Sequence, residues 1–232
     1  MFRTLIRVAL VVAVLFASLI SAPPAEAAKL SGCDKLYGSY HYYAYLRSDS
    51  TTFYGMYGTW NRATMSISGA SSSNGRLMTS EMWVANGKDW AEAGLMQGYR
   101  GSAVGYYVFR GWADANGSYK ELTLSKVTQS AGVTDEYQIS RSGTTNKWWI
   151  YWNGSRVETG NTGFWSTQDI EMGGEAQSES ATPAATAGAF TMCGKGITSG
   201  GGQANFTKQS NSVASGMTGS SPATSAWKWS IS

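Results

Sequence analysis

The stretch DWAEAGLMQG, residues 89–98, decides the fold because it has the pattern of a packed strand, with a lone carboxyl group, Glu92, between two alanines. In an extended strand, successive side chains point to opposite faces. The two alanines and Leu95 therefore fall on one face. Trp90, Glu92 and Gly94 fall on the other face. The stretch predicts a strand with one packed face and one face that presents a single carboxyl group beside an aromatic ring.

The rest of the chain repeats this pattern in short aromatic and β-branched runs separated by turn residues. Asn116-Gly117 and Asn153-Gly154 suit tight hairpins, because Asn and Gly tolerate positive φ. Many short strands without helical periodicity favour an antiparallel sandwich or barrel. Residues 196–222 are small and polar, which predicts a loop broken by a short strand at 204–206. The expected strands are 39–47, 51–60, 64–68, 79–87, 89–98, 106–113, 119–126, 135–142, 147–154, 168–177 and 189–193.

The first residues have the features of a secretory signal peptide. Arg3 and Arg7 precede an apolar run at residues 8–20, and the small-residue pattern Ala25-Glu26-Ala27 follows it. The run is too short to span a bilayer comfortably, and no second apolar segment follows. We therefore expect cleavage after residue 27, secretion, no membrane contact after cleavage, and a single domain over residues 28–232.

Charge and cysteine content narrow the classes of partner. Without residues 1–27 the formal charge falls from +3 to +2, which does not indicate binding of nucleic acid or of an anionic membrane. Cys33 and Cys193 are the two cysteines, and in an oxidising compartment we expect them to form one disulfide. Two distant thiols and the single histidine, His41, do not favour a metal site. For the oligomeric state we expect a monomer.

Several familiar sites are excluded by the residues that the chain has. His41 is the one base available to a serine triad, and its place in the stretch SYHYYAY is typical of an ordinary strand residue. Residues 114–118 resemble the start of a calcium loop, but Ser125 stands where that loop needs a bidentate glutamate. The glycine-rich run near residue 199 has no following Lys-Ser or Lys-Thr, so it does not indicate a phosphate loop.

The carboxyl groups are more informative than these motifs. Alternation in QDIEMGGEAQ, residues 168–177, places Asp169, Glu171 and Glu175 on one face of a second strand. Four residues along a regular strand separate Glu171 from Glu175 by roughly 13 Å, so only a bulge at the glycines between them would bring them together. Pairing Glu175 with Glu92 across adjacent strands, about 5 Å apart, is the geometrically simpler arrangement. Two carboxyl groups so placed do not ionise together easily, so one keeps a proton.

Four short motifs occur in an informative order: AEAG at 91–94, KWWIYW at 147–152, GFWS at 163–166 and MGGE at 172–175. Their order resembles the neprosin domain, a family of secreted glutamic endopeptidases, over roughly residues 53–206. Members of that family carry an Ile-Glu-Ala-Gly-Trp type motif, a Trp-Trp segment, a Gly-Tyr-Trp-Pro type turn and a Trp-Gly-Gly-Glu motif. Together with similarity to the wider glutamic peptidases, the resemblance implies a two-sheet antiparallel β-sandwich of the concanavalin-like jelly-roll kind.

The resemblance also implies a function and a site. The first catalytic glutamate of the family falls on Glu92 and the second on Glu175. One carboxylate would take a proton from water as it attacks a peptide carbonyl, and the protonated partner would polarise that carbonyl. We expect Trp90, Trp165 and Glu171 to line the groove for a peptide or protein substrate. Activity should be highest at acidic pH, and neither a metal nor an organic cofactor is implied.

Departures from the family pattern affect specificity. Leu95 and Met172 stand where the family has tryptophan, and Ser166 stands where it has proline. The preference for proline that some relatives show is therefore not carried over. Two alternatives remain open: a carbohydrate-binding or carbohydrate-cleaving sandwich, favoured by ten tryptophans and thirteen tyrosines, and a non-catalytic secreted domain that keeps the scaffold.

Overall fold

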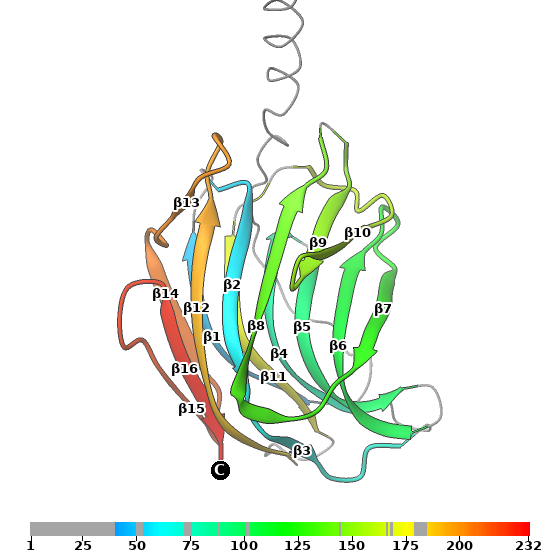
Figure 1. The fold of residues 1–232 in the computed structure, drawn as a ribbon, viewed down its shortest axis with the longest axis vertical. Helices are drawn as coiled ribbons and strands as arrows, with labels where there is room; N and C mark the ends of the chain where they lie inside the picture. Colours follow the sequence, from blue (N-terminus) through cyan, green and yellow to red (C-terminus); the bar gives the residue numbers. More distant parts are fainter. Residues whose placement is uncertain are drawn as a thin grey trace, which may run out of the picture.

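The computed structural model describes residues 40–49, 53–71, 76–87, 89–100, 103–143, 145–165, 167, 169–178 and 185–232. The regular elements of these residues are strands, arranged in two antiparallel sheets that lie one in front of the other (Figure 1). The predicted all-β, two-sheet sandwich is confirmed. In this described part of the chain there is no helix with the length and apolar character needed to span a bilayer. The predicted signal peptide and Cys33 lie outside the described residues.

The first sheet has seven strands, in the order β14-β1-β11-β4-β5-β6-β7. The central hairpin β4–β5 turns at Gly87, whose φ of 65° suits glycine. The strand that carries Glu92 is therefore central in the sheet. The bounds are β1 (Tyr40–Asp49), β4 (Leu77–Asn86), β5 (Asp89–Arg100), β6 (Ala103–Ala113), β7 (Tyr119–Lys126), β11 (Asp169–Ser178) and β14 (Gln209–Val213).

The second sheet has nine strands. Seven of them follow the order β10-β9-β8-β2-β12-β16-β15, and the other two, the short strands β3 and β13, pair with β12. The β9–β10 hairpin turns at Asn153-Gly154, where both residues have positive φ, as the sequence predicts. The bounds are β2 (Gly55–Arg62), β3 (Met65–Ile67), β8 (Ser130–Arg141), β9 (Trp148–Trp152), β10 (Ser155–Glu158), β12 (Ala185–Ile197), β13 (Gln203–Ala204), β15 (Met217–Ser220) and β16 (Ala226–Ile231).

Large aromatic side chains fill the space between the sheets. The rings of Trp60 and Tyr137 stack with their centroids 4.0 Å apart, and those of Phe190 and Trp229 stack at 4.9 Å. Trp229 also reaches the first sheet at Gly174, where a Cβ atom would lie 2.2 Å from Cζ2 of the indole. The second glycine of the MGGE motif is therefore the place where the core presses on the back of β11.

The C-terminal strands are the main departure from the sequence prediction. The segment predicted as a loop with one short strand contains β14 and β15 as well as β13, and β10 and β16 were also not expected. Every residue of β14 is exposed, and the strand is held by pairing with the backbone of β1. Because this pairing is independent of side-chain type, hydrophobic alternation does not reveal it. The bulge considered at Gly173-Gly174 is absent, since β11 pairs in continuous register with both neighbours over residues 169–176.

Candidate active site

Five buried acidic residues lie on one face of the seven-stranded sheet, which we call the acidic face. The opposite face packs on the other sheet through residues such as Met82, Ala93 and Met172, so the acidic face is turned away from the core. Alternation along β5 and β11 is as the sequence predicts. The acidic residues are Glu81 on β4, Glu92 on β5, and Asp169, Glu171 and Glu175 on β11, and each is at most 7% exposed.

Glu92 and Glu175 do not lie on adjacent strands, which corrects the predicted pairing. Strand β4 separates them: Trp83 pairs with both Glu92 and Glu171, whereas Glu175 pairs with Thr79. The two glutamates are thus offset by two strands and four residues, which on a regular sheet is about 16 Å between Cα atoms. The sequence assigns each carboxyl group to a face but does not give the order of the strands.

Glu81 fills the gap and was not singled out from the sequence. It pairs with Gly94 on one side and Gly173 on the other, which places its Cα about 8 Å from those of Glu92 and Glu175 on a regular sheet. Its carboxyl group accepts a hydrogen bond from the Thr79 hydroxyl. The available signal was its alternation with Trp83 in the stretch TSEMWV, which puts both side chains on the same face.

The Glu92 carboxyl group is held by two donors. Trp83 Nε1 donates to Oε2 at 3.0 Å, and the Tyr119 hydroxyl donates to Oε1 at 2.9 Å. Gly111 makes this possible, because a Cβ atom there would lie 2.3 Å from Glu92 Oε1 and 2.7 Å from the Tyr119 oxygen. Gly111 on β6 therefore provides the space in which the carboxyl group and the tyrosine meet.

Burial and neighbouring carboxyl groups keep protons on this face. Burial is the main cause that raises the pKa of Glu92 to about 8; Glu175 and Glu121 of β7 also act upward, while the bonds from Tyr119 and Trp83 act in the opposite direction. The pKa of Glu81 is raised well above its usual range, first by burial and then by Glu92 and Glu175. Both carboxyl groups therefore stay protonated at the pH at which an exposed glutamate is ionised.

The acidic residues at the β11 end of the face have different partners. Gln177 Nε2 donates to Glu175 Oε1 at 3.3 Å. Arg47 donates to both oxygens of Asp169, at 3.0 and 3.1 Å, and its Nε lies 3.6 Å from Glu171 Oε1. Glu171, which the sequence predicts in the groove, is thus on the acidic face but lies in an ion-pair network with Arg47.

The two predicted groove tryptophans lie in different settings. Trp90 is on the acidic face, half-buried, and stacks on Tyr119 with ring centroids 6.1 Å apart. Trp165 lies in the loop before β11, is 56% exposed, and has the Arg141 guanidinium 5.2 Å from its ring centroid. Trp90 thus adjoins the group that holds Glu92, whereas Trp165 belongs to the loop that leads into β11.

The sequence also makes predictions about cysteine and metal chemistry. Cys193 lies exposed on β12, and its predicted disulfide remains a prediction because Cys33 is outside the described residues. Among the described residues, no group of three or more histidine, cysteine, aspartate or glutamate side chains is arranged to hold a metal ion. Buried carboxyl groups close together are suited to moving protons to and from a bound water.

Comparison with known proteins supports the fold. No family model and no curated protein matches this sequence, so the resemblance to the neprosin family remains a prediction. A solved structure of scytalido-glutamic peptidase with a transition state analog inhibitor matches with a TM-score of 0.58 and 13% identity, over 82% of this chain and 98% of that one. SCP-B, a member of the eqolisin family of peptidases in complex with the tripeptide Ala-Ile-His, matches with a TM-score of 0.52 and 12% identity, over 84% and 100%. The chain therefore has the β-sandwich of these glutamic peptidases.

Proposed function

We propose that this protein is a secreted glutamic endopeptidase that cleaves peptide bonds at the acidic face. The observation that carries the proposal is the row of buried glutamates, Glu92, Glu81 and Glu175, across three neighbouring strands. The sandwich shared with structures of glutamic peptidases is consistent with this chemistry. No step of the proposed reaction needs a metal or an organic cofactor.

The environment of each carboxyl group favours a division of roles. We assign the acid to Glu92, because burial raises its pKa and two donors fix its orientation. We assign the base to Glu175, which would take a proton from the attacking water while Glu92 polarises the carbonyl and then protonates the leaving amine. Glu81 lies between them, with its Cα about 8 Å from each on a regular sheet, so its carboxyl group would also face the water and the scissile carbonyl.

Activity should be present at acidic pH and should be lost as the pH rises through about 8. The reason is that Glu92 acts as an acid only while protonated, and its pKa is raised to about 8. Replacing Tyr119 by phenylalanine removes a donor that stabilises the ionised form, so the pKa of Glu92 should rise and the alkaline limb of kcat should move to higher pH. The measurement is the pH profile of kcat for the parent and for Tyr119→Phe.

A matched control is Tyr107→Phe. Tyr107 lies on β6, on the acidic face like Tyr119. Its hydroxyl donates to the backbone oxygen of Ala103 at 3.5 Å. Its variant should keep the alkaline limb of the parent. An unchanged limb in Tyr119→Phe, or an equal shift in both variants, would remove Glu92 from the role of acid.

The function itself is tested by digestion of a denatured protein such as casein, run beside a panel of insoluble polysaccharides at pH values of roughly 3 to 7, the range in which carboxyl groups titrate. We expect peptide products from casein and no release of soluble sugar. Binding to, or cleavage of, a polysaccharide without proteolysis would favour the carbohydrate alternative. Absence of all three activities in a folded preparation would favour a non-catalytic domain.

A further inference from the structure

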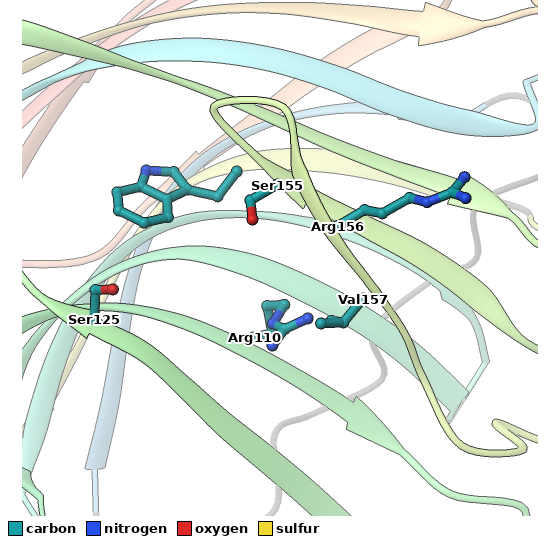
Figure 2. A pocket seen from close by; sticks show the side chains of 6 residues that line it. Arg110, Ser125, Ser155, Arg156 and Val157 are labelled. Carbon is teal, nitrogen blue, oxygen red and sulfur yellow. The ribbon is translucent and has the colours of Figure 1, made fainter.

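A cavity of about 110 Å³ lies between strands at the end of the sandwich where the β9–β10 hairpin passes over β6 and β7 (Figure 2). It is separate from the acidic face, because Arg110 of β6 points from the opposite face of the sheet. The cavity is larger than one water molecule requires. The lining residues are Arg110 on β6, Ser125 on β7, Trp152 on β9, and Ser155, Arg156 and Val157 on β10.

Arg110 is a buried cation that has no counter-charge among the described residues. Its side chain is 4% exposed, and neither Nε nor Nη1 has a hydrogen-bond partner in the described structure. Burial lowers its pKa to about 10, and no carboxylate contributes to that shift. Arg110 is therefore charged at neutral pH. A buried, unpaired charge is unfavourable, so an anionic partner would stabilise the fold.

Two hydroxyl groups complete the polar part of the cavity. Ser125 faces the same side as Arg110 because of a register shift in β7: Phe109 pairs with Thr123, but Val108 pairs with Ser125. Ser155 follows the turn at Asn153-Gly154 and is exposed, so the cavity opens to solvent on the β10 side. Figure 2 shows both hydroxyl groups turned toward the space next to the Arg110 guanidinium.

The other polar lining residues are committed elsewhere. Arg156 lines the cavity with its stem, while its guanidinium is turned away in Figure 2 and lies 4.3 Å from the Trp149 ring centroid. Trp152 Nε1 donates to Asp135 at 3.1 Å. Within the described part of the chain, the donors left for a ligand are thus one guanidinium and two hydroxyl groups, and none of the lining side chains is acidic.

We propose that this cavity binds a small oxyanion, a carboxylate or a phosphate, through the Arg110 guanidinium and the hydroxyl groups of Ser125 and Ser155. Guanidinium groups pair with both kinds of anion through charge-assisted hydrogen bonds, and serine hydroxyl groups can donate to the remaining oxygens. The proposal is independent of peptidase activity, because none of these residues lies on the acidic face.

The test is thermal unfolding of the protein in acetate, in inorganic phosphate and in chloride at matched ionic strength and neutral pH. Specific binding raises Tm with increasing anion concentration, and we expect a rise of a few degrees over chloride for acetate, phosphate or both. A response to acetate alone identifies a carboxylate site, and a response to phosphate alone identifies a phosphate site. Equal Tm values in all three salts would overturn the proposal.

Variants locate the effect. Arg110→Leu should lose the response to the anion. Arg156→Gln leaves the buried guanidinium of Arg110 in place and should retain the response. Ser125→Ala combined with Ser155→Ala leaves Arg110 in place and should raise the anion concentration needed for half of the effect several-fold. If Arg110→Leu does not fold, this double serine variant tests the site on its own. An anion response that survives in Arg110→Leu, or that is unaltered by loss of both hydroxyl groups, would rule the site out.

Discussion

Replacing either Glu92 or Glu175 by glutamine will lower kcat/KM for a denatured protein substrate at acidic pH by about 10²–10⁴-fold, the range typical of lost acid or base catalysis. Glutamine keeps the size of the side chain and removes the ionisable group that gives or takes the proton. The Trp83 bond to position 92 can persist, so the fold should be retained. The measurement is steady-state proteolysis, with unfolding curves to show that each variant is folded.

The matched control is Glu158→Gln. Glu158 lies on β10 in the other sheet, where it accepts hydrogen bonds from Ser142 and Lys147, and its replacement should leave kcat/KM within a few-fold of the parent. If Glu92→Gln and Glu175→Gln digest the substrate as well as the parent does, the assigned roles are wrong.

Glu81→Gln distinguishes two versions of the site. Because Glu81 lies between the other two carboxyl groups, we expect its loss to lower kcat, though by less than the loss of either assigned residue. If Glu81→Gln is inactive while Glu92→Gln keeps activity, the working pair is Glu81 and Glu175, which are closer together in the sheet.

Adding one methyl group at Gly94 or Gly173 will lower the free energy of unfolding. We expect the loss to exceed the value typical of an overpacked core, which is about 1–3 kcal/mol. A Cβ atom on Gly94 would lie 2.2 Å from the Ser80 carbonyl oxygen, and one on Gly173 would lie 2.1 Å from that of Ala44. These atoms belong to neighbouring strands, so relief requires the strands to separate. The measurement is the denaturant midpoint of Gly94→Ala and Gly173→Ala.

Gly132→Ala on β8 is the matched control. Nothing lies within 4 Å of a Cβ atom at that position, so the free energy of unfolding should change by no more than about 0.5 kcal/mol. Gly94 and Gly173 flank Glu81. As denaturant is added to these variants, we therefore expect proteolysis to be lost before the nine-stranded sheet unfolds. Parent-like midpoints in both glycine variants would show that β5 pairs less closely with β4, and β11 less closely with β1, than the register indicates.

The sequence correctly predicts to which face of the sheet a side chain points, but it does not predict which strands lie side by side. Alternation correctly places Glu92 opposite Ala91 and Ala93, and Glu175 on the same side of β11 as Glu171, because side-chain direction is a local property of an extended strand. Which strand lies beside which depends on contacts between distant segments. The insertion of β4 between β5 and β11, and with it the part played by Glu81, therefore required the structure.

Strands held by backbone pairing escape detection for a related reason. β14 has no buried side chain that would produce alternation, whereas β16 alternates Trp227 and Trp229 with exposed Lys228 and half-buried Ser230 over a run of only six residues. The unpaired Arg110 gives no signal in the sequence either, because YYVFRGWA is typical of a strand whether or not the arginine has a partner.

The position of β16 has a consequence for biosynthesis. Residues 226–231 lie between β12 and β15, and Trp229 of this strand contacts Gly174, directly next to Glu175. We expect a chain that lacks these residues to have no strand between β12 and β15 and no indole behind Gly174. Under the proposed function, activity would therefore follow the addition of residues 226–231 and the pairing of β16 with its neighbours.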